Sequence, residues 1–457
     1  MPKHEKMELE DAVEFVLKEA SKRFDDVVVR ATRTQARQIK FTNNEVSTGK
    51  TWMDQSVGVF VAKDRRLATI DIKELERKEI LNTLNKLAKL VKQVQPNKEY
   101  GGIAEGPFRY KEIMNTFDPA IPKLGEELVD FVEKGVNAAL EHGAVRSSGK
   151  IQSSYTKEVL LTSNDVHAHQ KGTSITFSIR SFVEKDASAH RLSCARTMQH
   201  FRPEEAGARA GEMARQASNP KPGSAGKFDV LFDPLPFAAL LDHVGSAVSI
   251  YSVEAGLSFL ENRLNRRVAA EGVTIYDDAT LPGGMASTKY DAEGTPTRRN
   301  IVIRFGMLRT YLHNTSTAKR YKTNSTGNAG LIAPHPWNIV LEKGNFELNE
   351  MIREVKHGLF VTNVWYTRFQ NYKTGEFSTL PRDAVFLIKN GELAGAVKEV
   401  RISDSMPHIL INIEAIGKRR EQIVGWEVET PVKCGHVLVR GVNVTKSAGK
   451  FPVEKPL

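Results

Sequence analysis

The chain has 457 residues, of which 40% are hydrophobic and 26% are charged. This length and apolar content allow a sizeable core and suggest about two or three domains. No window approaches the ~20 consecutive apolar residues of a membrane span, and the charged start MPKHEKMELEDAVEF has no apolar signal-peptide region. We therefore expect a soluble, cytoplasmic protein with no membrane partner.

The formal net charge is +10, from 65 basic and 55 acidic residues, and such an excess attracts nucleic acid in some proteins. Here the basic residues are spread along the chain in short pairs, such as Arg65-Arg66, without an aromatic-interleaved stripe. A solvated surface explains the charge better than a nucleic-acid partner does. Cys194 and Cys434 lack a secretory context, so we expect reduced thiols.

The N-terminal half alternates between helical and strand patterns. Residues 8–22 carry apolar side chains at helical spacing. Residues 25–72 alternate β-branched and polar residues around the turn signal Asn43-Asn44. Residues 73–94 return to helical spacing, which completes a helix, strands, helix order.

The same order recurs further along the chain, over residues 118–217. The hexapeptides FTNNEV and LTSNDV, which begin at Phe41 and Leu161, fall at corresponding places in the two stretches. We therefore predict an N-terminal α/β domain over residues 1–220, with an internal duplication of an α-β-α unit over 8–94 and 118–217.

Pro, Gly and Ser concentrate between Ser218 and Pro234, which predicts a domain boundary. A second, β-rich domain is expected over 225–457, beginning with one long helix over 236–269. Mostly strands with glycine-containing turns follow, such as LPGG and KNGEL. The fold class is therefore α+β, with two domains and a curved, mostly antiparallel C-terminal sheet around the long helix.

Two sequence motifs carry less than they suggest. STGKT, at residues 47–51, resembles part of a phosphate-binding loop, but that motif requires Gly five residues before the Gly-Lys pair, where Asn44 stands. A hairpin tip is the better interpretation. A serine hydrolase has no support either, since no G-x-S-x-G elbow is present.

The start of the long predicted helix, LLDHVGSAVSIY, places an acid beside a histidine on an apolar segment. Its apolar side chains recur at helical spacing and form one stripe: Phe237, Leu240, Leu241, Val244, Val248 and Tyr251. Asp242, Ser246 and Ser249 lie on a different, polar face. Taken alone, this pattern indicates a buried helix with a polar edge.

The C-terminal half resembles a known family. Its successive blocks DDATLPGG, DAEGTPTRRNIVIRFGMLRTYL, GLFVTN, TGEFS and AVFLIKNGELAGAVKEVRIS are similar, in this order, to the TldD/PmbA family, also called TldD/TldE or modulators of DNA gyrase. The resemblance covers at least residues 225–445, and the N-terminal half is compatible with it.

The resemblance implies one of two kinds of subunit. TldD-type subunits carry H-E-x-x-x-H on the long helix and a C-terminal cysteine, which together bind zinc for peptide-bond hydrolysis. TldE/PmbA-type subunits lack that motif and pair with the first kind. In this chain the motif falls on Leu241, Asp242 and Ser246, so both histidines are missing. The resemblance therefore implies a non-catalytic TldE-like subunit without its own cofactor. Its TldD-type partner in a heterodimer would hold the zinc and hydrolyse unfolded peptides.

Two alternatives remain open from the sequence. Cys434 matches the family's cysteine block and is expected to face the degenerate motif. With His436 and His243 it gives an atypical zinc site, and the chain would then be a metallopeptidase in its own right. The charge and the family's older name leave a nucleic-acid or gyrase-associated binding protein as a further alternative. Trp365 and Tyr366 are expected to narrow or reshape a substrate groove.

Overall fold

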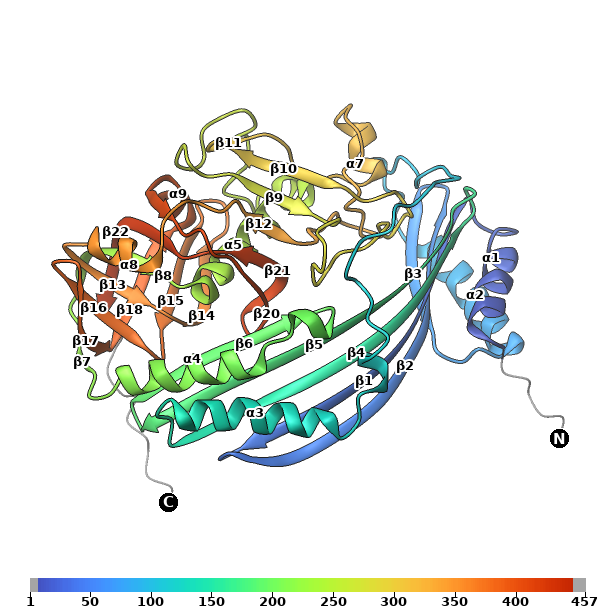
Figure 1. Ribbon diagram of the computed structural model, residues 1–457. Helices are drawn as coiled ribbons and strands as arrows, with labels where there is room; N and C mark the ends of the chain where they lie inside the picture. Colours follow the sequence, from blue (N-terminus) through green and yellow to red (C-terminus); the bar gives the residue numbers. More distant parts are fainter. Residues whose placement is uncertain (1–6, 447–457) are drawn as a thin grey trace, which may run out of the picture.

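The computed structural model describes residues 7–446. A long, curved six-stranded sheet forms one layer, with helices on one side and the elements of the C-terminal half on the other (Figure 1). Helices and largely antiparallel sheets share the chain, so the predicted α+β class is confirmed. Within the described residues, no helix is long and apolar enough to cross a bilayer.

The long sheet consists of two units with the same order of elements. The first unit contains α1 (Leu9–Ala20), β1 (Asp26–Thr42), β2 (Glu45–Lys63), β3 (Arg66–Ile72) and α2 (Arg77–Gln93). After a short 3-10 turn (Ile121–Lys123), the second contains α3 (Glu127–Glu141), β4 (Arg146–Thr162), β5 (His167–Glu184), β6 (Ala187–Ala195) and, past a second such turn (Met198–His200), α4 (Pro203–Gln216). The units meet at β1 and β4, which gives the order β3-β2-β1-β4-β5-β6.

The two similar hexapeptides occupy matching turns, each between the first and second strand of its unit. Asn43 and Asn44 have φ angles of 51° and 71°, and Asp165 has a φ angle of 58°. Asn and Asp adopt this left-handed conformation more readily than other non-glycine residues. Their placement agrees with a shared origin of the units, which stays a prediction.

Residues 47–51 do not form the hairpin tip, contrary to the expectation for STGKT. The tip is Asn43-Asn44, and residues 47–51 lie inside β2. The register with β1 slips by one residue between Lys40 and Phe41, which leaves Ser47 as a bulge. The Ser47 hydroxyl donates to the Lys40 carbonyl oxygen at 3.2 Å.

One face of the long sheet is covered by helices. Val27 and Val29 of β1 are buried with residues of α1 and α2. Further along the sheet, Ile39 and Phe177 are buried with residues of α3 and α4. All of these strand residues have odd numbers, because successive side chains of a strand point to opposite faces and the β1 register keeps the parity of its neighbours.

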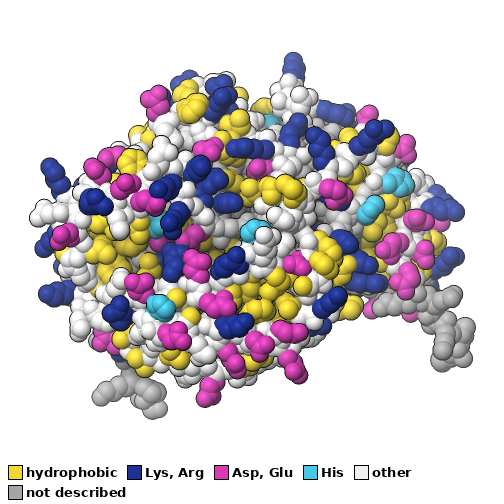
Figure 2. Space-filling model, viewed as in Figure 1, with side chains coloured by type: hydrophobic (Ala, Val, Ile, Leu, Met, Phe, Trp, Pro, Cys, Tyr) yellow, Lys and Arg dark blue, Asp and Glu magenta, His cyan; other side chains and the backbone are white. Residues whose placement is uncertain are grey.

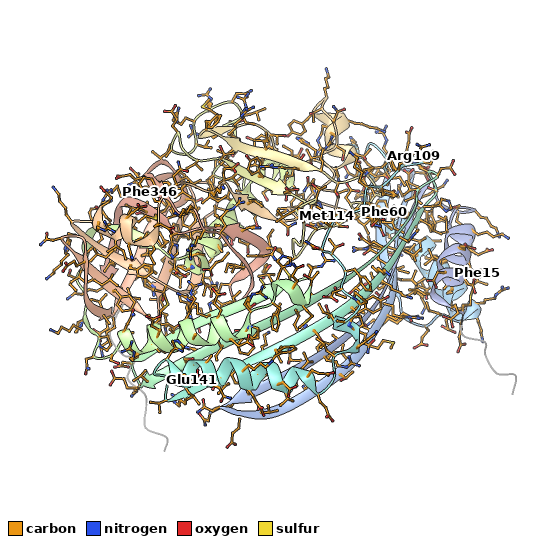
Figure 3. All side chains as sticks on the ribbon, viewed as in Figure 1. Phe15, Phe60, Arg109, Met114, Glu141 and Phe346 are labelled. Carbon is orange, nitrogen blue, oxygen red and sulfur yellow. The ribbon has the colours of Figure 1, made fainter. Side chains whose placement is uncertain are left out.

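The other face meets the C-terminal half. Val28 and Phe60, which have even numbers, are buried in a cluster with Tyr290. Figure 3 shows Phe60 on the side of the sheet toward the C-terminal half, whereas Phe15 on α1 and Glu141 on α3 lie on the helix side. The long sheet is therefore a shared wall between the helices and the C-terminal elements.

The C-terminal half contains two sheets rather than the single sheet expected. The ten-stranded sheet comprises β7 (Lys221–Pro222), β8 (Gly226–Phe232), β13 (His357–Val361), β14 (Val364–Asn371), β15 (Glu376–Pro381), β16 (Val385–Lys389), β17 (Glu392–Lys398), β18 (Val400–Ser405), β19 (Ile413–Ile416) and β22 (Val437–Lys446). The six-stranded sheet comprises β9 (Ile275–Asp278), β10 (Arg299–Arg304), β11 (Met307–Leu308), β12 (Ile339–Leu341), β20 (Glu421–Gly425) and β21 (Val428–Cys434). Pairing is antiparallel except for β7 with β17, β8 with β13 and β12 with β21.

Up to residue 446, five helices accompany these sheets: α5 (Pro234–Ala247), α6 (Ile250–Glu254), α7 (Thr315–Arg320), α8 (Leu348–Arg353) and α9 (Met406–Ile411). The predicted helix over 236–269 is therefore wrong beyond Ala247. Ser249 is extended, with ψ at 127°, and breaks the helix. The Ser258 hydroxyl donates to the Ala247 carbonyl oxygen at 2.7 Å, which satisfies a helix-end group.

Irregular chain follows α6 although its apolar residues are spaced as in a helix. Asn262 and Asn265 have φ angles of 58° and 59°, which a helix does not allow. Leu260 and Val268 are nevertheless buried in the main C-terminal core. The apolar spacing over these residues thus reflects burial in irregular chain and not a helix.

The predicted domain boundary is tied into the structure. Lys221 and Pro222 pair in parallel with Val397 and Lys398 of β17. The Gly223 N–H also donates to the Lys398 carbonyl oxygen at 2.8 Å. The division into two domains at this segment stays a prediction.

Candidate functional site

Helix α5 carries the positions of the degenerate motif and lies within the main C-terminal core. Twelve of its 14 residues are buried, and only His243 and Ser246 are not. The preceding residue, Asp233, is extended, and Pro234 occupies the first turn, where a missing N–H costs nothing. The helix is therefore held by packing on nearly all sides.

Asp242, at the general-base position, binds backbone rather than facing a free space. Its Oδ2 accepts from the Glu429 N–H at 2.8 Å, and its Oδ1 accepts from the Thr430 N–H at 3.2 Å. Both donors belong to β21. The carboxylate therefore ties the middle of α5 to this strand.

The two histidine positions point in different directions. Leu241 has no exposed surface and belongs to the main core, whereas Ser246 is exposed. Residues five apart on a regular helix are separated by about 140° around its axis, which accounts for the difference. The two positions do not converge on one point.

Cys434 lies at the start of α5 rather than beside the degenerate motif. Its Sγ donates to the Pro234 carbonyl oxygen at 3.4 Å, and its side chain is fully buried. Burial raises the pKa of this thiol well above its ordinary value. Pro234 precedes Leu241 by seven residues, or about 10 Å of helix rise. Cys434 therefore does not face the motif positions, contrary to the expectation from the sequence.

His436 takes part in a buried ion-pair network around Asp233. Its Nε2 lies 3.2 Å from Asp233 Oδ1, while Arg191 Nη1 lies 3.2 Å from Asp233 Oδ2 and Arg209 Nη2 lies 3.9 Å from Oδ1. Burial alone would raise the pKa of Asp233, but Arg191 and the His436 hydrogen bond hold it well below its ordinary value. Arg191 comes from β6 and Arg209 from α4. The network therefore fastens the start of α5 to the long sheet.

His243 lies on the side of α5 that faces β14. Its ring centroid is 4.3 Å from that of Phe369. Burial lowers the pKa of His243, so the neutral imidazole is favoured. The three candidate ligands thus occupy three separate places: Cys434 at Pro234, His436 at Asp233 and His243 at Phe369.

Three models of one family match the chain: PmbA/TldA metallopeptidase domain 1 over residues 27–92, the central domain over 119–217 and the C-terminal domain over 225–446. The chain belongs to the PmbA/TldD family.

Individual relatives agree with this assignment. The chain is 25% identical to the metalloprotease PmbA of Escherichia coli over 450 residues, which are 95% of this chain and 96% of that one. It is 34% identical to a metalloprotease of Methanocaldococcus jannaschii over 216 residues, 45% of this chain and 47% of the relative. The chain thus matches the archaeal relative over about half its length.

Solved structures share the fold of this PmbA/TldD chain. TldE from Thermococcus kodakarensis superposes with a TM-score of 0.85 at 21% identity, over 95% of this chain and all of that one. A protein of Thermotoga maritima described as a putative modulator of a DNA gyrase gives 0.84 at 24% identity, over 96% of this chain and all of that one. At these identities the likeness concerns the fold.

The zinc expected in metallopeptidases of this family does not fit the donors on α5. Leu241 offers no ligand atom, both oxygens of Asp242 accept backbone hydrogen bonds, and Cys434 lies about two turns away. Zinc sites use three or four protein ligands that converge on one point. Among the described residues, no group of three His, Cys, Asp or Glu side chains is placed to hold a metal ion.

A groove of about 640 Å³ runs between the β20–β21 hairpin and the face of the long sheet that points toward the C-terminal half of this PmbA/TldD chain. Its residues include Lys40, Lys150 and Gln152 from the sheet and Met285, Val424 and Trp426 from the opposite wall. Trp365 does not line the groove directly but packs against Trp426, with ring centroids 4.9 Å apart. The aromatic residue in the groove wall is therefore Trp426, and not Trp365 or Tyr366 as expected from the sequence.

Trp365 and Tyr366 instead form part of the wall's support. The guanidinium groups of Arg180 and Arg382 lie 4.7 Å and 4.5 Å from the Trp365 ring centroid. Tyr366 has a φ angle of 54°, and its N–H donates to Glu427 at 2.6 Å. These contacts join the long sheet to β14 and the β20–β21 hairpin.

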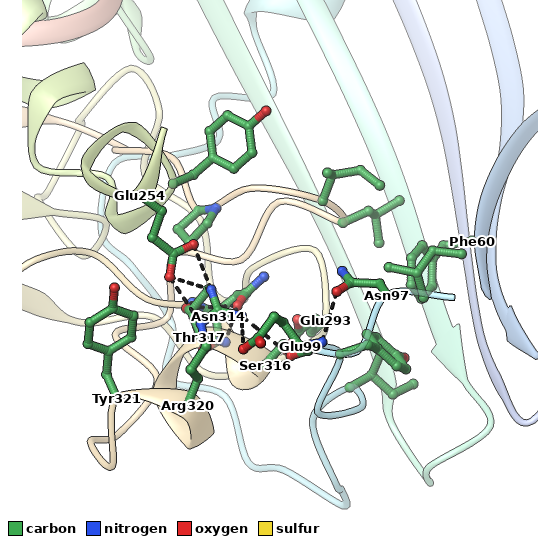
Figure 4. Close-up of a pocket in the computed structure, with 17 residues that line it drawn as sticks. Phe60, Asn97, Glu99, Glu254, Glu293, Asn314, Ser316, Thr317, Arg320 and Tyr321 are labelled. Atoms are coloured by element: carbon green, nitrogen blue, oxygen red, sulfur yellow. Dashed lines mark hydrogen bonds and ion pairs between the residues drawn. The ribbon is translucent and has the colours of Figure 1, made fainter. Parts of the chain in front are cut away.

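A second cavity, of about 510 Å³, lies between the two halves of the chain (Figure 4). Phe60 and Tyr100 line it from the N-terminal half, and Glu254, Glu293 and Arg320 line it from the other. Arg320 Nη2 donates to both carboxylate oxygens of Glu254, at 2.5 Å and 2.6 Å. This cavity thus combines charged and polar side chains with apolar ones such as Phe60.

Glu293 and the neighbouring Asp291 are buried acids beside this cavity. Burial, reinforced by Asp291, raises the pKa of Glu293 to about 8. Burial likewise raises the pKa of Asp291 to about 7, although it accepts from the Ala329 N–H at 2.9 Å. Both lie in the block DAEGTP, which carries the family resemblance, yet spacing alone did not single them out. Their burial depends on residues far along the chain, such as Ala329, and cannot be predicted from local sequence.

Proposed function

We propose that this chain is a non-catalytic, TldE-like subunit of a cytosolic TldD/TldE zinc-metallopeptidase complex that degrades or processes unfolded peptides. The observation that carries the proposal is the state of α5. The motif positions hold a core leucine, an aspartate bound by two backbone donors and an exposed serine. A TldD-type partner would supply the zinc and with it the Lewis-acid chemistry.

The groove beside Trp426 supports a role in handling peptide. Extended peptides bind through backbone hydrogen bonds and alternating side-chain pockets. The groove has a strand-built floor with polar side chains such as Gln152 and an opposite wall with apolar side chains such as Met285. In this proposal the chain completes the peptide-binding space and the partner cleaves the bond.

Co-expression with a TldD-type subunit tests the proposal. We expect one complex on gel filtration, zinc bound in proportion to the partner, and cleavage of an unfolded peptide. Substitution of the partner's motif glutamate should abolish cleavage. Asp242→Asn in this chain is the matched control and should leave cleavage in place, since the proposal gives Asp242 no chemical role.

The alternative metallopeptidase, with an atypical site at Cys434, His436 and His243, makes a distinct prediction. It requires stoichiometric zinc in the isolated chain, lost on Cys434→Ser. The separate contacts of these three side chains count against it. Zinc of that kind, together with peptide cleavage by the chain alone, would replace the proposed function with this one.

A nucleic-acid or gyrase-associated role has less support. On the face shown in Figure 2, Lys and Arg side chains lie among Asp and Glu side chains. Salt-dependent binding of duplex DNA by the purified chain would favour this role, because neutralised phosphates release counterions.

A further inference from the structure

The outer edge of strand β2 is open along its first half. β1 pairs with one side of β2 throughout, but β3 pairs with the other side only from Val57 onward. Within residues 7–446, no other strand pairs with the earlier part of this edge. All side chains over residues 45–54 are exposed, including Trp52 at 39% and Met53 at 67%. Figure 1 shows this hairpin at the lower margin of the long sheet.

The matching strand of the second unit has no such open edge. β5 pairs with β6 from Ile175 onward. Before that point, the Thr173 N–H donates to the Thr116 carbonyl oxygen at 3.1 Å, and the Gln170 side chain accepts from the Lys289 N–H at 3.2 Å. The chain's own loops therefore cover the β5 edge. The β2 edge keeps backbone groups without a partner among the described residues, and native proteins usually protect such edges.

The register identifies the outward-facing groups of β2. The Ser163 N–H donates to the Val27 carbonyl oxygen, so odd residues of β1 face β4 and even residues face β2. Ala36 is opposite Trp52, which means that even residues of β2 face β1. The N–H and C=O groups that point outward therefore belong to the odd residues: Gly49, Thr51, Met53 and Gln55.

The limits of the open edge define its centre. The bulge at Ser47 ends the regular strand on one side, and β3 begins opposite Val57 on the other. Residues 48–56 remain, and their midpoint is Trp52. A bulge bends a strand and increases its twist, which turns the hairpin tip away from a strand paired alongside.

We propose that this edge pairs antiparallel with the same edge of a second copy of the chain, about a two-fold axis at Trp52. In that register the outward-facing odd residues meet, with Gly49 opposite Gln55 and Thr51 opposite Met53. Lys50 lies opposite Asp54 twice, and the two Trp52 side chains adjoin. The contact joins two copies of this chain and does not rest on the proposed function.

Neighbouring registers lack this complementarity. Only registers that bring odd residues opposite odd residues form the hydrogen-bonded ladder. Centring the pair on Lys50 sets two lysines against each other, and centring it on Thr51 or Met53 leaves Lys50 without an acid opposite. Opposite charges across a strand pair stabilise it and like charges destabilise it.

In the proposed dimer the long sheets of the two copies would continue into one sheet. This sheet would extend the floor of the groove beside Trp426.

Sedimentation velocity of the full chain tests the contact. The wild type is expected to dimerise, and Lys50→Glu and Asp54→Lys should each weaken the dimer by about tenfold or more, since each converts two attractive pairs into two repulsive ones. An equal mixture of the two variants should dimerise again, because every pair between positions 50 and 54 is then oppositely charged.

Thr51→Pro provides a second variant. It removes an outward-facing N–H without removing a bond to β1, so the dimer should be lost while the melting temperature is kept. Lys86→Glu, on the exposed surface of α2, is the charge-matched control and should leave the dimer intact. A monomeric wild type, dimers that persist in both single variants, or a mixture that stays monomeric would each overturn the inference.

Discussion

The two ends of the motif-bearing part of α5 hold their acids in different ways. Asp233, just before the helix, is surrounded by the side-chain charges of Arg191, Arg209 and His436. Asp242, two turns on, is bound by two uncharged backbone donors of β21. Asp233 fastens the helix to the long sheet, and Asp242 fastens it to β21 of the six-stranded C-terminal sheet. Both acids are therefore used for structure, and neither is free for chemistry.

The largest effect is expected at the charged end. Asp233→Asn leaves the buried Arg191 guanidinium without its counter-charge and should lower the free energy of unfolding by about 3–5 kcal/mol. Urea titration measures this change. The double variant with Arg191→Met should be less destabilised than the single one, because no unpaired charge remains. Equal losses in both would show that Asp233 matters for packing and not for charge.

A smaller effect is expected at the backbone-bound end. Asp242→Ala leaves the Glu429 and Thr430 N–H groups without their acceptors and should cost about 1–3 kcal/mol in the free energy of unfolding. Asp242→Asn keeps one acceptor oxygen and should fall between the wild type and alanine. If alanine costs as much as Asp233→Asn, the difference between the two ends does not hold.

Acidity separates the charged network from the cavity acids. The pKa of Asp233 is lowered by folding, so its contribution to stability is present above its unfolded value and is lost as pH falls. The pKa of Glu293 is raised from 4.5 to about 8, so the folded state holds the extra proton between these values. The contribution of Glu293 therefore declines as pH rises through that window.

Glu293→Gln tests the second half of this contrast. The variant should lose less stability than the wild type between about pH 5.5 and pH 8.5, as measured by urea titration at each pH. Glu99→Gln, on the same cavity but with its side chain 64% exposed, is the control and should follow the wild type. A wild-type slope in Glu293→Gln would assign the pH dependence to other groups.

The sequence predicted those parts of the fold that depend on local patterns. Strand alternation and the Asn43-Asn44 turn identify the β1–β2 hairpin, and helical spacing identifies the start of α5. The end of α5 was missed because the apolar residues that follow it, such as Leu260, are buried in irregular chain. The same spacing served both conformations.

The contacts of the site depend on residues far apart in the chain. The donor to Asp242 at Glu429 lies 187 residues away, and His436 lies 203 residues from Asp233. The family resemblance placed Leu241, Asp242 and Ser246 on one helix, but no local pattern gives their partners. Every residue except proline has a backbone N–H, so residue types do not reveal which N–H groups bind Asp242. The sequence therefore shows an acid at this position but not its structural role.

The smallest expected effect concerns Cys434 in a helix rebuilt as a zinc motif. The triple variant Leu241→His, Asp242→Glu, Ser246→His restores the H-E-x-x-x-H pattern. If Cys434 faced this turn, its thiolate would complete a zinc site, since imidazole and thiolate are preferred ligands. Its Sγ instead contacts the Pro234 carbonyl oxygen, about 10 Å of helix rise before position 241.

We therefore expect the zinc content of the triple variant to be the same with and without Cys434→Ser. The introduced histidines also start on different sides of the helix, one in the core and one at the surface, so stoichiometric zinc is not expected. Burying an imidazole at position 241 without a partner should cost about 1–3 kcal/mol in unfolding free energy. Metal analysis of the folded variants decides the question. One zinc per chain that is lost with Cys434→Ser would contradict this expectation. It would mean that Cys434, at the first turn of α5, and the motif positions can bind one ion, although the structure holds Asp233 and Asp242 in separate places.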